Sequence, residues 1–84
     1  MQQEGDVVNV DAATGRFALR ADDGSYVLAE QLGTRPMQAG DRLSGRMDVT
    51  GTETLAGIAA GQQYDVFIVA YGLSLDAVES ALQA

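Results

Sequence analysis

Four arginines, arranged in two pairs, are the side chains of this sequence best suited to binding an anion. They are Arg16, Arg20, Arg42 and Arg46. A guanidinium group binds carboxylates and phosphates through paired N–H donors, so these residues form a candidate patch for a small anionic ligand or an acidic partner segment. The alternative is that they form weak surface ion pairs with neighbouring aspartates. Those aspartates are Asp11, Asp22 and Asp48.

Catalytic and metal-binding side chains are scarce. The chain has no histidine, cysteine or lysine, so its serines have no base that would activate them as nucleophiles. Asp22 and Asp23 precede Gly24, a pattern that favours a tight hairpin turn over a cation-binding loop. We therefore expect a protein that is not an enzyme and holds neither a metal nor a cofactor.

Size and charge set further bounds. The 84 residues are 46% hydrophobic, which indicates one folded domain over residues 1–84. A core this small gives marginal stability, so the sequence is also compatible with a homodimer. Twelve acidic residues against five arginines give a formal charge of −7, which repels nucleic acid. The start resembles no secretory signal and the apolar run 66–71 is too short to span a bilayer, so we expect a cytoplasmic protein that binds no membrane.

The segments that carry these residues have the patterns of short β-strands. Residues 16–21 alternate strictly, with Phe17 and Leu19 on one face and the arginines on the other. Further strands are expected over 5–11, 26–30, 42–49 and 64–71, separated by glycine-rich turns.

Three segments depart from plain alternation. Gly45 lies on the inward row of its strand, where a glycine often marks a bend of a small barrel. The pattern of the segment 51–62 is compatible with either a short strand near Leu55 or an ordered loop. A helix is expected at about 74–83, with Leu75, Val78 and Leu82 on one buried stripe.

The first half of the chain resembles the cold-shock domain, a small barrel of the oligonucleotide-binding (OB) type. The resemblance rests on Gly5, the strand 7–10, Gly15, the strand 16–21 and Asp22-Asp23-Gly24, with Ala39-Gly40-Asp41 resembling the entry into the fourth strand. It implies an OB-like antiparallel barrel of five or six strands.

The same resemblance argues against the function of that family. Cold-shock domains stack unpaired bases on exposed aromatic side chains, whereas the matching positions here are Asn9, Arg16, Ala18 and the stretch 27–30, none of them a platform aromatic. Base stacking contributes about 1–3 kcal/mol per base, so its absence removes the main attraction for single strands.

We therefore expect a mainly β protein that acts as a non-enzymatic interaction module for a protein partner. Two alternatives are a binding domain for a small anionic ligand at the arginine patch and weak binding of single-stranded nucleic acid. A ligand site requires the arginines to converge on a concavity, whereas an interface requires an exposed apolar patch.

Overall fold

Six strands and a terminal helix make up the described part of the chain. The computed structural model describes residues 3–59 and 61–83. The strands are β1 (Gln3–Asp11), β2 (Arg16–Ala21), β3 (Tyr26–Gln31), β4 (Arg42–Gly45), β5 (Gly51–Gly57) and β6 (Gln63–Leu73), and helix α1 (Leu75–Gln83) follows. Within these residues, no helix has the length and apolar character needed to cross a membrane.

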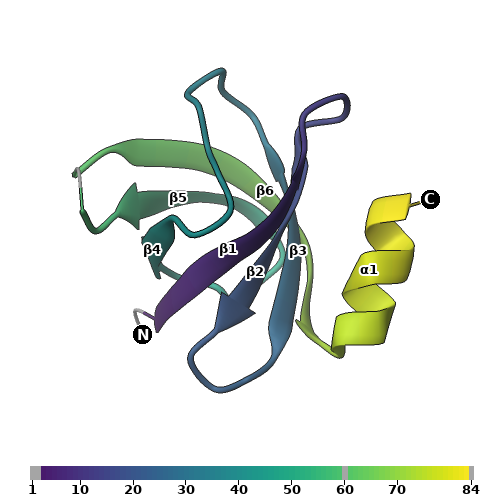
Figure 1. The fold of residues 1–84 in the computed structure, drawn as a ribbon. Helices are drawn as coiled ribbons and strands as arrows, with labels where there is room; N and C mark the ends of the chain where they lie inside the picture. The colour runs from purple at the N-terminus through teal and green to yellow at the C-terminus, as the bar shows by residue number, and fades with distance from the viewer. Residues whose placement is uncertain (1–2, 60, 84) are drawn as a thin grey trace.

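The strands close into a barrel in the order β1-β2-β3-β6-β5-β4, and every neighbouring pair is antiparallel. β1 therefore lies between β2 and β4, and β6 lies between β3 and β5 (Figure 1). The predicted class, a small antiparallel β-barrel with a short C-terminal helix, is confirmed.

The barrel interior is filled by the inward rows that alternation predicts. Phe17 and Leu19 of β2 have no exposed surface, and neither do Val66 and Ile68 of β6. The segments after β3 and after β4 each add one buried methionine to this core. The full core comprises Val7, Phe17, Leu19, Val27, Ala29, Met37, Leu43, Met47, Leu55, Tyr64, Val66 and Ile68.

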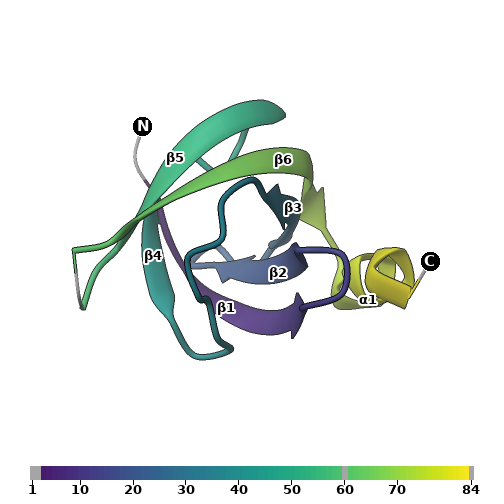
Figure 2. The same cartoon turned by 90° about the horizontal axis from the view of Figure 1, so that it is seen from above.

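Helix α1 covers the outer surface of β2 and β3 (Figure 2). Ala18 and Leu28, which are paired across these two strands, form a second buried cluster with Val78 of the helix. The Ser74 hydroxyl accepts the Ala77 N–H at 3.2 Å and so caps the first turn. One expectation was wrong: Leu75 is 46% exposed, because the helix turns toward the barrel the face that carries Val78.

The predicted strand over 42–49 was too long, because it ends at Gly45. This glycine adopts φ +150°, and an added Cβ would lie 2.6 Å from Leu55 Cδ2. The chain bends there, and the segment 46–50 leaves the sheet and carries Met47 into the core. Of the segment 51–62, Gly51–Gly57 form β5, which is longer and begins earlier than a short strand near Leu55, and Ala60 lies outside the described residues.

Candidate functional site

The arginines of β2 and β4 lie on either side of β1, as expected from their positions in the sequence. Arg42 donates to Asp6 at 3.0 Å, to Glu4 at 3.1 Å and to Asp22 at 2.6 Å. Arg20 reaches the other oxygen of Asp6 at 3.5 Å. The cluster thus joins three carboxylates to two arginines, so its net charge is negative.

The other two predicted residues stay outside this cluster. Arg16 approaches Glu30 across β2 and β3 at 3.8 Å. Arg46 is exposed on the segment after β4 and takes part in no ion pair among the described residues. The structure therefore brings Arg20 and Arg42 together, but with acidic neighbours between them and not around an empty concavity.

The hydrogen bond from Arg42 holds the pKa of Asp6 below its usual value, with a smaller contribution from Arg20. Hydrogen bonds to Asp22 and, next, to Asp6 raise the pKa of Arg42. Because the folded-state pKa of Asp6 is lowered, its contribution to stability is present above its unfolded-state pKa and is lost as the pH falls through the folded value.

Replacing Arg42 with glutamine tests this cluster. We expect Arg42→Gln to raise the pKa of Asp6, measured by NMR titration of its carboxyl carbon. The difference in free energy of unfolding between the original protein and the variant should be largest at neutral pH. It should become smaller in acid, where the carboxylates are protonated in both proteins. Arg46→Gln is the matched control, and an Asp6 titration that is the same in both variants would contradict the assignment.

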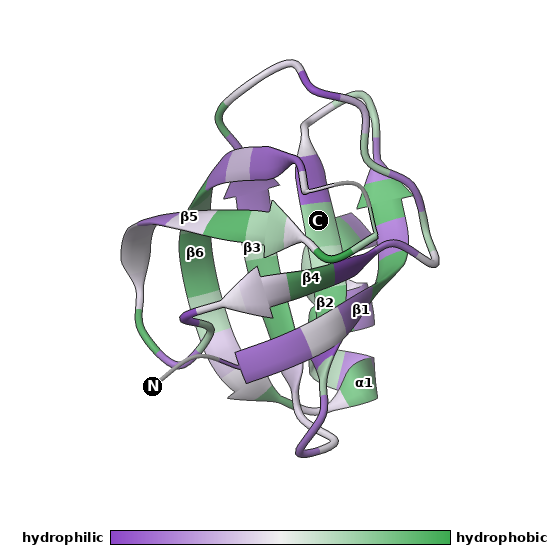
Figure 3. Ribbon diagram, turned by 90° about the vertical axis from the view of Figure 1, so that its left-hand side faces the viewer, coloured by the Kyte–Doolittle hydropathy of each residue, from purple (hydrophilic) through white to green (hydrophobic). Residues whose placement is uncertain are grey.

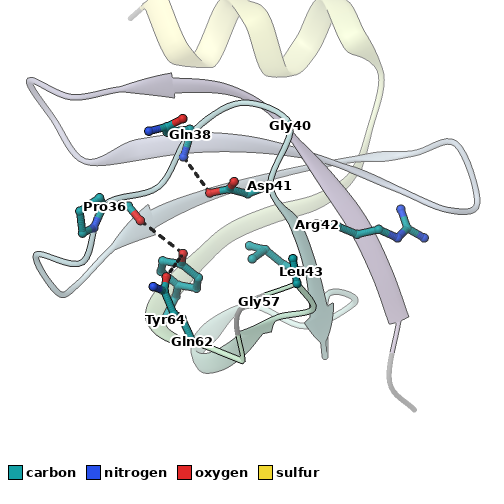
Figure 4. Close-up of a pocket in the computed structure, with 10 residues that line it drawn as sticks. Pro36, Gln38, Gly40, Asp41, Arg42, Leu43, Gly57, Gln62 and Tyr64 are labelled. Carbon is teal, nitrogen blue, oxygen red and sulfur yellow. Dashed lines mark hydrogen bonds between the residues drawn. The ribbon is translucent and has the colours of Figure 1, made fainter.

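A cavity of about 350 Å³ opens at the end of the barrel where β3 ends and β4 begins. Leu43 and Tyr64 form part of its lining, and the Tyr64 hydroxyl donates to Gln62 Oε1 at 2.8 Å and lies 3.3 Å from the Pro36 carbonyl oxygen. Figure 4 shows the guanidinium of Arg42 directed away from the other lining residues. Among the described residues, Arg42 thus contributes to the wall of the cavity without directing its guanidinium group into it.

Exposed apolar side chains lie along the outer face of β6, on the side of the barrel away from the arginine cluster. Phe67, Val69 and Tyr71, called here the β6 patch, are 44%, 39% and 47% exposed. Phe67 lies on the outer surface between Glu30 of β3 and Thr52 of β5. Hydrophobic colour runs along much of β6 in Figure 3. This strand therefore shows apolar surface to solvent as well as to the core.

Tyr71 continues the patch to the barrel end opposite the cavity. There it borders a hollow of about 320 Å³, whose lining includes buried Met47 and the carboxylates Asp23 and Asp48. The Asp23 carboxylate accepts hydrogen bonds from the backbone and hydroxyl of Ser25, and the hydroxyl does most to lower its pKa. The surface that extends from the β6 patch is thus apolar at its centre and acidic at this end.

Comparison of the chain with protein-family models, with curated proteins and with solved structures finds no match. Any functional assignment therefore rests on the geometry and chemistry of the barrel surface.

Sequence reasoning missed the β6 patch, although a signal for it is present. From Tyr64 to Tyr71 both alternating rows are largely apolar, and only one row can face the interior of a small barrel. The exposed row contains Phe67 and Val69. A strand face that contacts only water is usually polar, so the second apolar row indicates a surface that binds something else.

Proposed function

We propose that this protein is a non-enzymatic interaction module that binds a protein partner through the β6 patch. The exposure of Phe67, Val69 and Tyr71 on one strand is the observation that carries this proposal. Adjacent exposed apolar side chains on a small domain are typical of interaction surfaces, because burial on binding removes them from water.

The contrast between the two halves of the outer surface supports this assignment. On β2 and β3, α1 covers the outward residues Ala18 and Leu28. On β6, no described element of the chain covers Phe67 in the same way, since α1 contacts β2 and β3. A partner would supply the cover that the helix supplies elsewhere.

The two alternative functions have less support. An anionic ligand at the arginine patch would have to displace the carboxylates that already hold Arg20 and Arg42. Nucleic acid would meet a charge of −7, and two of the positions that match the cold-shock platform, Ala18 and Leu28, are covered by α1. The likeness to cold-shock and OB domains is therefore proposed for the barrel and not for its ligand.

Site-specific photo-crosslinking in the native host tests the function. A photoreactive amino acid at position 67 should capture a defined partner, whereas the same group at Ala13, in the exposed turn after β1, should not. With the purified partner, we expect Phe67→Ser to weaken binding by about tenfold or more, as loss of a central apolar contact does. The melting temperature should change little.

Ile58→Ser is the matched control, because Ile58 is 47% exposed and lies after β5, outside the β6 patch. Equal loss of binding in the two serine variants would contradict the proposal. Salt-sensitive binding of a labelled single-stranded oligonucleotide, measured by fluorescence anisotropy, would instead support the nucleic-acid alternative.

A further inference from the structure

The first residues of β5 form an open sheet edge beside the β6 patch. β5 pairs with β6 from Gly51 onward, but its pairing with β4 is confined to Leu43–Gly57 and Ser44–Ala56. Among the described residues, no backbone hydrogen bond joins the start of β5 to the segment 46–50. The barrel is therefore closed by few bonds on this side.

The alternation of backbone groups identifies Thr52 as the centre of this edge. The Ile58 N–H donates to the Arg42 carbonyl at 2.9 Å, so Ile58 points its backbone groups toward β4. Every second residue along a strand does the same, which places the N–H and C=O of Thr52 on the β4 side. Since β4 ends at Gly45, Thr52 has no strand to pair with there.

The charges around this edge are mainly negative. Glu53 follows Thr52, and Asp65 accepts the Thr54 hydroxyl at 3.0 Å on the adjoining strand. Asp23 and Asp48 line the hollow below Tyr71, and Arg46 is the one arginine on the segment 46–50. Among the described residues, these four carboxylates outnumber the nearby arginines, which are Arg46 and, in a hollow shared with Asp65, Arg35.

We propose that the partner docks as an extended basic segment that pairs with the β5 edge at Thr52 and places apolar side chains toward Phe67. This inference rests on the proposed function and specifies its partner. Backbone pairing with an open edge gives affinity to an extended peptide, while alternate side chains give specificity. Lysine or arginine on that segment would complement the four carboxylates.

A second copy of this chain fits the same edge less well. In a symmetric pair of β5 edges, Glu53 of one copy would approach Glu53 of the other, on proteins that each carry −7. Like charges placed opposite each other across a sheet destabilise the pairing. Charge thus favours a basic partner over self-association.

The test uses the full chain and a capped nine-residue peptide of alternating lysine and valine. Titration followed by NMR should shift the amides of residues 51–54 and 67, and binding should weaken as salt is added. Methylation of the backbone nitrogens along one edge of the peptide should weaken binding by about tenfold, because it removes the pairing hydrogen bonds. A peptide with glutamate in place of lysine should not bind.

Two variants separate this inference from the proposed function. Thr52→Pro removes the N–H at the open edge and leaves the β6 ladder intact, so it should weaken binding of the peptide and of the crosslinked partner by about tenfold. If Phe67→Ser weakens partner binding and Thr52→Pro does not, strand pairing is overturned and the interaction function stands. If neither weakens it, both are overturned.

Two further outcomes would overturn the inference without any variant. Equal affinity for the methylated and unmethylated peptides would exclude backbone pairing. A concentration-dependent dimer in sedimentation, with shifts at residues 51–54 and no peptide binding, would assign the edge to a second copy instead.

Discussion

Replacing Val78 with aspartate should detach α1 and cause the largest loss of stability among single changes in the helix. Val78 is 1% exposed and lies against Ala18 and Leu28. A helix of nine residues does not hold together alone in water, so it depends on this contact. Burying an unpaired carboxylate is strongly unfavourable, and we expect a loss of about 2–4 kcal/mol.

Thermal melts and binding of a hydrophobic dye measure this result. For a domain of this size, 1 kcal/mol corresponds to about 4–8 °C, so the melting temperature should fall by roughly 8–32 °C. Dye binding should rise as Leu28 becomes exposed. Ala77→Asp adds the same charge on the exposed side of the first turn and should change little. Similar melting of the two variants would show that the helix is not docked through Val78.

Substitution of Gly45 should have the second large effect, because its conformation and its surroundings both exclude a side chain. Its φ of +150° is one that other residues rarely adopt. Its Cβ would also lie 2.6 Å from Cδ2 of Leu55, a residue with no exposed surface and little room to move. We expect Gly45→Ala to cost about 2–5 kcal/mol, from backbone strain of about 1–2 kcal/mol and overpacking of about 1–3 kcal/mol.

Gly24→Ala separates the two causes. Gly24 has φ +90° and no atom within 4 Å of an added Cβ, so its substitution shows backbone strain alone. Chemical denaturation should therefore give a clearly larger loss for Gly45→Ala. Combining Gly45→Ala with Leu55→Val should cost less than the sum of the two single changes. Equal losses for the two glycines, or strict additivity, would remove Leu55 from the explanation.

Much of the barrel was predictable because alternation along a strand reports which face is buried. The row of Phe17 and Leu19 was assigned inward from the pattern alone, and both are fully buried. Glycine positions likewise predicted the bend at Gly45. The end of β4 was missed because the row containing Met47 stays apolar after the bend, where it fills the barrel end instead of a sheet position.

The candidate site was less accessible from the sequence. Arg16, Arg20 and Arg42 were placed correctly on the strands that flank β1, whereas Arg46 lies beyond the end of β4. The identity of their ion-pair partners depends on register. Asp6 meets Arg42 because β1 and β4 are paired at those two residues. No local pattern states that a carboxylate 36 positions away will lie 3.0 Å from a guanidinium.

By itself, the sequence determined the mainly β class, the inward rows, the C-terminal helix and the acidic charge, since each depends on residue type and on spacing within one segment. Tertiary structure decided which outer surfaces are covered. Leu28 and Phe67 are both apolar and both point outward from neighbouring strands, yet α1 buries the first and leaves the second exposed. That difference arises because the path of the chain after β6 carries the helix over β2 and β3, and a path in space has no counterpart in local periodicity.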